Sequence, residues 1–402
     1  MKKRLLFVDD DPNVLNGLRR SLHRMREEWD MEFVDAAAGA LAAFEKQPYD
    51  AVISDMRMPE MDGADLLEQI KQRYPDTVRI ILSGQSSRSA VFRSIAPAHQ
   101  FLAKPCDPQE LSSRLGQAFA MRDLLSNQSI KTIVAQLRSL PSLPTLYEEV
   151  MVELRREDPS FQRIARMIST DVGMATKLLQ LANSAFIGTS GRVSSLLQAL
   201  TLIGLENVRT LVLSVNVFSQ FEGNNNVAAY LPRIWDHSIS VSLLAQNIAS
   251  AENGSKGLLE ECFTAGLLHD LGKVVLLAKL PRETSQLYAT KTGASSEAER
   301  ERLGCTHAEV GAYLMSIWGL PLPLVHAVAY HHIPSATADT KFSSLTAVHV
   351  ADVIASEQDP LALNHDAVLD VEYLSRIGLS DKETAWRGLY SNATAAAKHG
   401  NS

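Results

Sequence analysis

Acidic residues and a lysine in the first third of the chain have the types and spacing of a phosphoryl-acceptor site. Clustered carboxylates repel one another unless a cation neutralises them, and Mg2+ prefers one or two carboxylates together with waters and a phosphate. An ammonium and a hydroxyl stabilise charge on a transferring phosphoryl group, so the set suits an aspartate nucleophile. The alternative is an acidic turn beside unrelated surface residues. The set consists of Asp9, Asp10, Asp55, Ser83 and Lys104.

Histidines and aspartates in the second half form a second candidate site. Imidazoles combined with carboxylates suit Fe, Mn, Zn or Ni, and a carboxylate shared between two ions supports a dinuclear centre for phosphoester hydrolysis. Two alternatives need no metal: His349 and Asp352 are spaced to pair with each other, and His331-His332 suits a helix end. The candidate ligands are His237, His269, Asp270, His307, His331, His332 and Asp352.

Strands and helices alternate over residues 1–124, and the ends of the predicted strands carry the residues of the first site. Five short apolar runs, each followed by a helix-length segment, indicate a doubly wound five-stranded parallel sheet covered on both faces. Strand carboxyl ends meet at one edge of such a sheet, where the acidic set falls. The predicted strands are Arg4–Val8, Met31–Val34, Ala51–Ser54, Val78–Leu82 and Gln100–Ala103.

The second half carries apolar residues at helical spacing and predicts an all-α domain. We expect a helical linker over 125–139, a helical domain over 140–357 and a partly disordered extension over 358–402, because prolines in Leu140–Pro144 stop a helix and the terminus is polar. The predicted helices are Phe161–Ile168, Met174–Leu181, Leu196–Leu202, Val208–Phe218, Ile234–Ala249 and Glu260–Leu268.

Composition excludes several classes of protein. The net charge is −7 and no basic block stands out, which argues against DNA binding. We find no apolar run long enough for a membrane span and no signal peptide. The three cysteines are far apart and make no disulfide framework, so we expect a cytoplasmic protein.

Residues 4 to about 120 resemble the receiver domain of two-component response regulators, through the acidic pair after the first strand, the segment Ile53–Gly63 and Phe101-Leu-Ala-Lys-Pro. The resemblance implies that Asp55 accepts the phosphoryl group, and that Asp9, Asp10, Asp55 and the backbone carbonyl of Arg57 hold Mg2+. It also implies that Ser83 and Phe101 are the switch residues and that Lys104 binds the phosphate. Phe101 stands where tyrosine is common.

Residues 138 to 340 resemble the HD-related output domain, HDOD. The resemblance rests on segments that include Leu140-Pro-Ser-Leu-Pro, Leu181-Ala-Asn-Ser-Ala-Phe and Ala265-Gly-Leu-Leu-His-Asp-Leu-Gly-Lys. HDOD domains are related to HD-GYP phosphodiesterases, whose ligand positions match the seven candidate residues in order, and Lys273 matches their HDxGK lysine. Two departures count against activity: Ile333-Pro-Ser replaces the Gly-Tyr-Pro segment, and Arg233 stands where a carboxylate ligand is expected, although Asp236 is nearby.

Two functional hypotheses follow for a response regulator switched at Asp55. In the first, the HDOD domain signals by binding a protein or a ligand; in the second, it is a receiver-gated, metal-dependent phosphohydrolase. The resemblance implies a sensor histidine kinase as phosphodonor, and we expect a homodimer and an unidentified downstream protein. Phosphorylation is expected to shift the fourth and fifth strands and the connector after residue 121.

Overall fold

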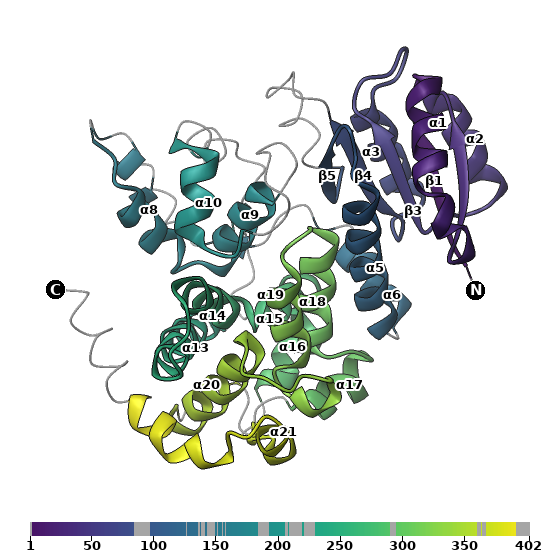
Figure 1. Ribbon diagram of the computed structural model, residues 1–402. Helices are drawn as coiled ribbons and strands as arrows, with labels where there is room; N and C mark the ends of the chain where they lie inside the picture. Colours follow the sequence, from purple (N-terminus) through teal and green to yellow (C-terminus); the bar gives the residue numbers. More distant parts are fainter. Residues whose placement is uncertain are drawn as a thin grey trace.

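The structure is a computed structural model. Two bodies of secondary structure lie along the chain: an α/β sandwich at the N-terminus and a larger helical assembly that contains the remaining helices (Figure 1). The residues described are 2–83, 97–125, 127–135, 137, 141–142, 149–150, 152–154, 156, 158–183, 193–205, 208, 219–220, 230–289, 295–359, 363 and 367–390.

A five-stranded parallel sheet with the order β2-β1-β3-β4-β5 forms the centre of the sandwich. The predicted doubly wound sheet is therefore confirmed. The second strand begins at Trp29, two residues before the predicted start, because Trp29 pairs with Lys3 at the first position of β1. The strands are β1 (Lys3–Val8), β2 (Trp29–Val34), β3 (Ala51–Asp55), β4 (Val78–Ser83) and β5 (Gln100–Ala103).

Alternation along β1 sends Leu5 and Phe7 into one apolar core and Leu6 and Val8 into another. The first core contains the buried residues of two helices, and the second contains those of two others, so helices cover both faces as the period-2 pattern requires. On the first face lie α1 (Pro12–Ser21) and α5 (Pro108–Leu124), and on the second α2 (Ala37–Lys46) and α3 (Gly63–Arg73).

The second half is helical, as predicted. Five predicted helices match observed ones: Phe161–Ile168 has the predicted bounds, and the other four extend up to four residues beyond theirs. Val208–Phe218 lies outside the described residues except for Val208. The connector contains α6 (Gln128–Ala135). The helices that follow are α8 (Phe161–Ile168), α9 (Val172–Ala182), α10 (Leu196–Ile203), α13 (Leu231–Ala251), α14 (Lys256–Leu268), α15 (Leu271–Lys279), α16 (Pro281–Tyr288), α17 (Ser296–Leu303), α18 (His307–Ile317), α19 (Leu322–Tyr330), α20 (Ser344–Gln358) and α21 (Val371–Arg376).

One apolar core continues from the sandwich into the helical assembly. Figure 1 shows α5 and α18 side by side, and the two helices pack against each other. Leu115 of α5 and Leu314 of α18 belong to the same buried cluster, which also includes Val134 of the connector. The N-terminal sandwich and the helical assembly are therefore joined by a packed interface as well as by the chain.

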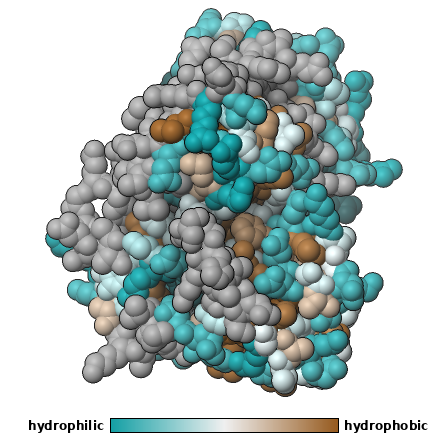
Figure 2. All heavy atoms as spheres, turned by 90° about the vertical axis from the view of Figure 1, so that its left-hand side faces the viewer, coloured by the Kyte–Doolittle hydropathy of each residue, from teal (hydrophilic) through white to brown (hydrophobic). Residues whose placement is uncertain are grey.

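The C-terminal residues 371–390 pack on the helical assembly. Tyr373, Leu374 and Trp386 join its apolar core, and Nε1 of Trp386 donates to Oε1 of Glu252 at 3.0 Å. The face drawn in Figure 2 mixes hydrophilic side chains with small groups of hydrophobic ones. Within the described ranges, the helices are too short or too polar to cross a membrane.

Candidate functional site

Asp9, Asp55 and Lys104 converge at the carboxyl edge of the sheet. Lys104 Nζ lies 2.6 Å from Oδ2 of Asp9 and also pairs with Oδ1 of Asp55. Both carboxylates are almost buried, whereas 24% of the Lys104 side chain is exposed. Burial raises the pKa of Asp9 although Lys104 opposes the shift. The site therefore combines two desolvated carboxylates with one ammonium that reaches solvent, as phosphoryl acceptance requires.

The other predicted receiver residues lie around this group. Asp10 is exposed just beyond β1, and the backbone N–H of Arg57 donates to Oδ2 of Asp55 at 2.8 Å. Phe101 is buried in β5, in the core beneath α2 and α3. Ser83 ends β4, and its side chain lies outside the described part of the chain.

A glycine lets α3 begin close to the acceptor. A Cβ at Gly63 would lie 2.1 Å from the backbone oxygen of Asp55, which no side chain tolerates. The backbone N–H of Gly63 donates to the carbonyl of Met56 at 3.0 Å, and Asp62 caps the helix by accepting from Asp65 N. Sequence reasoning placed Gly63 in the receiver motif without identifying this close approach.

All seven candidate ligands of the second site come together inside the helical assembly. They come from segments up to 115 residues apart, and most stand at helix ends, where a side chain can turn into the space between helices. His237 lies in α13, His269 ends α14, Asp270 precedes α15, His307 begins α18, His331 and His332 follow α19, and Asp352 lies in α20.

The donor atoms fall into overlapping groups around Asp270. Donor atoms lie within 4.8 Å of one another in three groups of three: His307, His331 and His332; His237, His269 and Asp352; and His269, Asp270 and His331. Asp270 presents one oxygen to each side, with Oδ1 3.2 Å from Nε2 of His307 and Oδ2 3.5 Å from Nε2 of His269. The arrangement has the form of a site for two cations bridged by one carboxylate.

Hydrogen bonds behind the rings fix which histidine nitrogen faces the centre. Nδ1 of His269 donates to the carbonyl of Gly266 at 2.6 Å, and Nδ1 of His331 donates to that of Val328 at 2.8 Å, because a carbonyl can only accept. Nε2 of each ring then points inward. Metal-binding histidines are held in this way in proteins, with the outer nitrogen bonded to a carbonyl or carboxylate.

Without a metal ion, protons on histidine and lysine side chains offset the negative charges of the buried carboxylates. Burial lowers the pKa of His307, but Glu299 and other neighbours outweigh it and raise the pKa to about 9. Burial and the charge on His307 lower the pKa of His332 to about 3. Lys273 Nζ lies 2.8 Å from Oδ2 of Asp270, and this pairing helps to keep the pKa of the buried Asp270 carboxyl well below its usual range. A metal ion would compete with these protons.

Three buried atoms show that the residues fit a cation. Nε2 of His269, Oδ1 of Asp270 and Oδ2 of Asp352 are fully enclosed and make no hydrogen bond of good geometry, although Nε2 of His307 lies 3.2 Å from Oδ1 of Asp270. An unpaired buried acceptor costs free energy, and each of these atoms faces the centre of the cluster. Their nitrogen and carboxylate donors are those that Fe, Mn, Zn and Ni accept, so the donor set suits the ions that the sequence predicted.

Residues close to this cluster in the sequence have other roles. Asp236 is exposed, and the guanidinium of Arg233 lies over the ring of Tyr230. Neither side chain joins the seven ligands in the cluster. His349 does not pair with Asp352: its Nδ1 donates to the carbonyl of His331 at 2.7 Å, and its Nε2 accepts from the backbone N–H of Asp370 at 2.9 Å. The i, i+3 pairing left open by the sequence is therefore wrong.

Sequence reasoning missed Glu299. Its side chain is fully buried, and Oε2 accepts from both the backbone N–H and Nδ1 of His307, each at 2.7 Å. The segment Ser296–Leu303 is strongly charged and looks like a solvated helix surface. The one available signal was that Glu299 lies four residues before the buried Leu303 and so on the same helix face.

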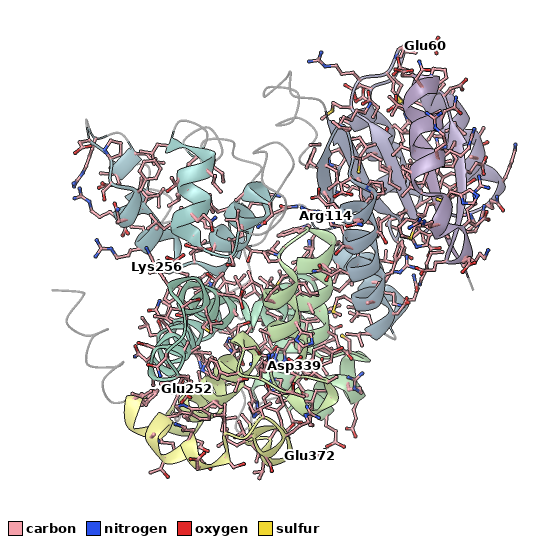
Figure 3. All side chains as sticks on the ribbon, viewed as in Figure 1. Glu60, Arg114, Glu252, Lys256, Asp339 and Glu372 are labelled. Carbon is pink, nitrogen blue, oxygen red and sulfur yellow. The ribbon has the colours of Figure 1, made fainter. Side chains whose placement is uncertain are left out.

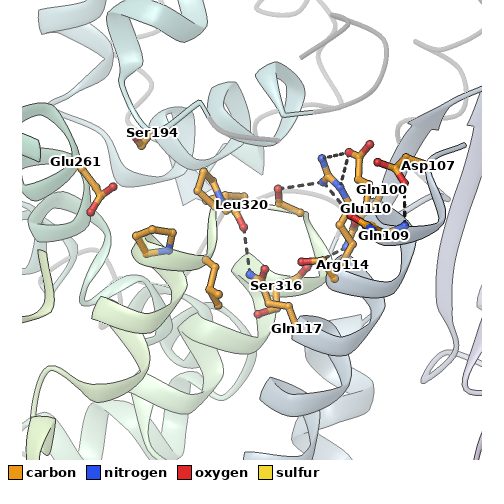
Figure 4. A pocket seen from close by; sticks show the side chains of 15 residues that line it. Gln100, Asp107, Gln109, Glu110, Arg114, Gln117, Ser194, Glu261, Ser316 and Leu320 are labelled. Carbon is orange, nitrogen blue, oxygen red and sulfur yellow. Dashed lines mark hydrogen bonds and ion pairs between the residues drawn. The ribbon is translucent and has the colours of Figure 1, made fainter. Parts of the chain in front are cut away.

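The sequence also did not predict the interface between the two domains. Arg114 of α5 lies where α5 meets the end of α18 (Figure 3) and donates to the carbonyls of Gly319 at 3.3 Å and Asn183 at 3.4 Å. Gln100 donates to the carbonyl of Ser316 at 3.0 Å, and Gln117 to that of Leu320 at 3.2 Å. These contacts line a cleft of about 580 Å3 (Figure 4).

Family models match both parts of the chain. The model described as response regulator receiver domain matches residues 5–116, and the model described as HDOD domain matches residues 140–334. Neither description is that of a DNA-binding domain. Receiver domains as a family generally bind Mg2+ and receive their phosphoryl group from a donor such as a sensor kinase.

Curated relatives match over parts of their length. An uncharacterized protein of Treponema pallidum is 27% identical over 214 residues, which cover 52% of this chain and 41% of the relative. The hydrogenase transcriptional regulatory protein HoxA of Cupriavidus necator is 29% identical over 166 residues, covering 40% of this chain and 33% of HoxA. The chain thus spans less than half of the length of these relatives.

Solved structures include related response regulators. The MmoQ response regulator from Methylococcus capsulatus is 26% identical, covers 61% of this chain and 96% of its own, and has a TM-score of 0.46. The receiver domain of an HD domain-containing protein from Pseudomonas fluorescens is 33% identical, covers 30% of this chain and 96% of its own, with a TM-score of 0.29. From the two family matches, the chain is a response regulator in which a receiver domain precedes an HDOD domain.

Proposed function

We propose that phosphorylation of Asp55 controls the HDOD domain through the junction, defined as β5 and α5 on the receiver side and residues 316–320 on the HDOD side. The observation that carries this proposal is the set of side chains that cross the junction. Gln100 donates to a carbonyl in the last turn of α18, and Arg114 and Gln117 donate to carbonyls of the turn that follows it. A shift of β5 or α5 therefore changes hydrogen bonds made to the HDOD domain.

The receiver pocket supplies the chemistry of the first step. An oxygen of Asp55 bonds to phosphorus while the P–N bond of a phosphohistidine in the sensor kinase breaks, and the departing imidazole takes up a proton. Lys104 neutralises charge on the transferred group. Asp9, Asp10, Asp55 and the carbonyl of Arg57 would hold Mg2+, which supplies further charge neutralisation when bound.

Position along β5 links the pocket to the junction. Lys104 follows directly after β5, Phe101 lies within it, and Gln100 begins it. Lys104 already pairs with Asp55, so an acyl phosphate changes the electrostatic field at one end of this four-residue strand. The junction contacts lie at the other end, and the strand is short enough to move as a unit.

A buried clamp joins the connector to the same two strands. Arg79 at the start of β4 donates through Nη2 to the carbonyl of Ala135 at 2.8 Å, and Nε2 of His99 bonds to the same carbonyl at 2.9 Å. Arg79 is almost fully buried, and burial lowers its pKa to about 10. Removing such a group would leave several carbonyls unpaired, so α6 is expected to follow β4 and β5.

We propose that the HDOD domain delivers its output by binding a protein or a ligand, with an affinity set by the receiver. A homodimer remains a prediction of this scheme. The coupling is a population shift: the phosphorylated receiver favours one arrangement of the junction, and the partner binds that arrangement more tightly.

Hydrogen exchange of the full chain tests the relay. The protein is compared with and without Mg2+ and beryllofluoride, which mimics a phosphoryl group on an aspartate. We expect the exchange rates of residues 114–117 and 316–320 to change in the wild type and to stay unchanged in Asp55→Asn. Exchange that responds in the receiver alone would refute control through the junction.

A second candidate function is favoured by the histidine and aspartate cluster. His237, His269 and Asp352 would hold one metal ion and His307, His331 and His332 a second, with Asp270 as a further ligand between the two groups. A pair of metals polarises a phosphoester and lowers the pKa of bound water, so a phosphohydrolase gated by the receiver is the corresponding enzyme. The three unpaired buried atoms support a bound cation.

The restricted access of solvent to the cluster favours a structural or sensing metal over a catalytic one. Of the seven ligands, His237 and His332 reach solvent most, with 10% and 13% of their side chains exposed. A phosphoester needs an open coordination position, which this burial restricts. Metal analysis of the purified chain, followed by phosphoester assays of wild type and His269→Ala, separates the cases: metal without hydrolysis supports the binding function, and hydrolysis lost in His269→Ala supports the enzyme.

A further inference from the structure

The position of His307 differs from that of His269 and His331, the other two fully buried histidines of the cluster. His269 and His331 each end a helix, so their Nδ1 atoms bond to the carbonyl three residues earlier in that helix. His307 is the first residue of α18 and has no preceding turn of its own helix. Another element must therefore hold its ring, and α17 provides Glu299.

The carboxylate of Glu299 is buried and accepts three hydrogen bonds. Its Oε2 accepts from the backbone N–H and Nδ1 of His307, and Oε1 accepts from the hydroxyl of Tyr288 at 3.3 Å. The side chain is 0% exposed. A buried carboxylate loses its hydration, and only strong hydrogen bonds compensate for that loss.

Capping of α18 accounts for only one contact of this carboxylate, the one with the backbone N–H of His307. Thr306 and Glu309 already form a complete capping box at the start of the helix: the side chain of each accepts from the backbone N–H of the other. This box satisfies the backbone N–H groups of Thr306 and Glu309 by local contacts. Glu299 comes from a separate helix, and its additional contact is the ring of His307.

The other ring nitrogen of His307 faces the centre of the cluster. Nε2 lies 3.2 Å from Oδ1 of Asp270, 3.1 Å from Nε2 of His332 and 3.4 Å from Nε2 of His331. A carboxylate that accepts from Nδ1–H leaves the Nε2 lone pair directed at this centre and makes it a stronger donor.

We propose that Glu299 is a positioning residue that makes His307 a metal ligand, as the outer carboxylate of a carboxylate–histidine–metal arrangement. This inference rests on the proposed metal centre of the HDOD domain and assigns a residue that touches no metal itself. It predicts that the two cation positions differ: the one with His307 depends on Glu299, and the one with His237, His269 and Asp352 does not.

Cobalt titration of the full chain tests the proposal. After chelator treatment, wild type, Glu299→Gln, Glu299→Asp and the control Glu301→Gln are titrated with Co2+, and visible absorption and a competing chelator report stoichiometry and affinity. Glu301 is exposed on the same helix. We expect two sites in wild type and in Glu301→Gln. In Glu299→Gln one site should weaken roughly 10- to 100-fold with the other unchanged, and Glu299→Asp should recover part of the loss.

The outcomes separate this inference from the metal centre. Wild type that binds no Co2+ refutes the metal centre itself and removes the basis for the inference. Two sites in wild type with the same affinities in both Glu299 variants refute the role of Glu299 alone. Circular dichroism monitors folding, and loss of the native fold in both variants while wild type binds two ions makes Glu299 a stability residue and overturns the proposal.

Discussion

The two sites of this chain place similar acidic groups in opposite surroundings. In the receiver pocket the carboxylates lie at strand ends, and their cationic partner Lys104 is 24% exposed, so a donor protein can reach them. In the HDOD cluster Asp270 and Lys273 are each about 2% exposed and surrounded by histidines. The first site is thus open to solvent through Lys104, whereas the second is closed to it.

The largest effect is expected when the phosphoryl acceptor of the receiver site, Asp55, is replaced. Asp55→Asn should abolish formation of acid-labile phosphate from a small-molecule phosphodonor such as acetyl phosphate, because the amide is not a nucleophile. Phosphoprotein gels measure the product. Asp11→Asn is the matched control: Asp11 caps α1 at the same sheet edge, and asparagine caps equally well. Phosphate retained in Asp55→Asn would place the acceptor elsewhere.

A buried lysine beside the junction should give a pH-dependent stability. Burial lowers the pKa of Lys177 from 10.5 to about 7, so between these values the unfolded chain binds a proton that the folded chain lacks. Stability from this group therefore rises with pH over that window, by roughly 5 kcal/mol at most. Near pH 7, Lys177→Met should be more stable than wild type.

Urea unfolding at pH 7 and pH 10 measures this effect as the difference between wild type and variant. The advantage of Lys177→Met should shrink as the pH rises, while the exposed control Lys279→Met should show no comparable trend. An advantage that is equal at both pH values would mean that Lys177 stays charged in the folded protein, held by Oε1 of Gln180 at 2.7 Å and the ring of Trp318.

Removal of the transition metal, with Mg2+ kept in excess, should destabilise the HDOD domain and leave the receiver unchanged. A ligand present at 100 times its dissociation constant stabilises the folded state by about 2.7 kcal/mol. Thermal unfolding before and after treatment with a chelator should show a lower midpoint for the transition of the HDOD domain. In His269→Ala the chelator should have little effect. Equal chelator sensitivity in that variant would assign the stabilising ion to another site.

The smallest effect is expected at the rim of the junction. Gln117→Ala removes one neutral hydrogen bond, to the carbonyl of Leu320, and should cost about 1 kcal/mol of unfolding free energy. It should also reduce the beryllofluoride response of residues 316–320 in hydrogen exchange. A full response in Gln117→Ala would confine the coupling to Arg114 and Gln100.

The sequence predicted the receiver more completely than the HDOD cluster for a physical reason. The residues of the receiver pocket follow apolar runs, so the topology of a parallel sheet brings Asp9, Asp55 and Lys104 together once the strands are recognised. The HDOD ligands come from separate helices whose relative positions no local pattern determines. Their identities came from the resemblance, and the structure supplied their convergence.

Glu299 and Arg114 escaped prediction because their burial depends on tertiary contacts. Each lies on a helix with several other charged residues, and a charged helix residue is usually solvated. Arg114 becomes buried only when the turn containing Gly319 packs against α5. That turn needs the positive φ of 71° at Gly319, which the sequence Trp-Gly-Leu-Pro does not reveal alone.

Linkage provides the most direct test of control through the junction. If junction contacts favour one receiver state, breaking them must change the affinity of the distant acidic pocket for a phosphoryl mimic. The measurement is the dissociation constant of beryllofluoride in wild type and in Arg114→Ala, in the full chain with Mg2+. The account predicts a change of roughly 5-fold or more, in either direction. Identical dissociation constants in a folded variant would contradict it.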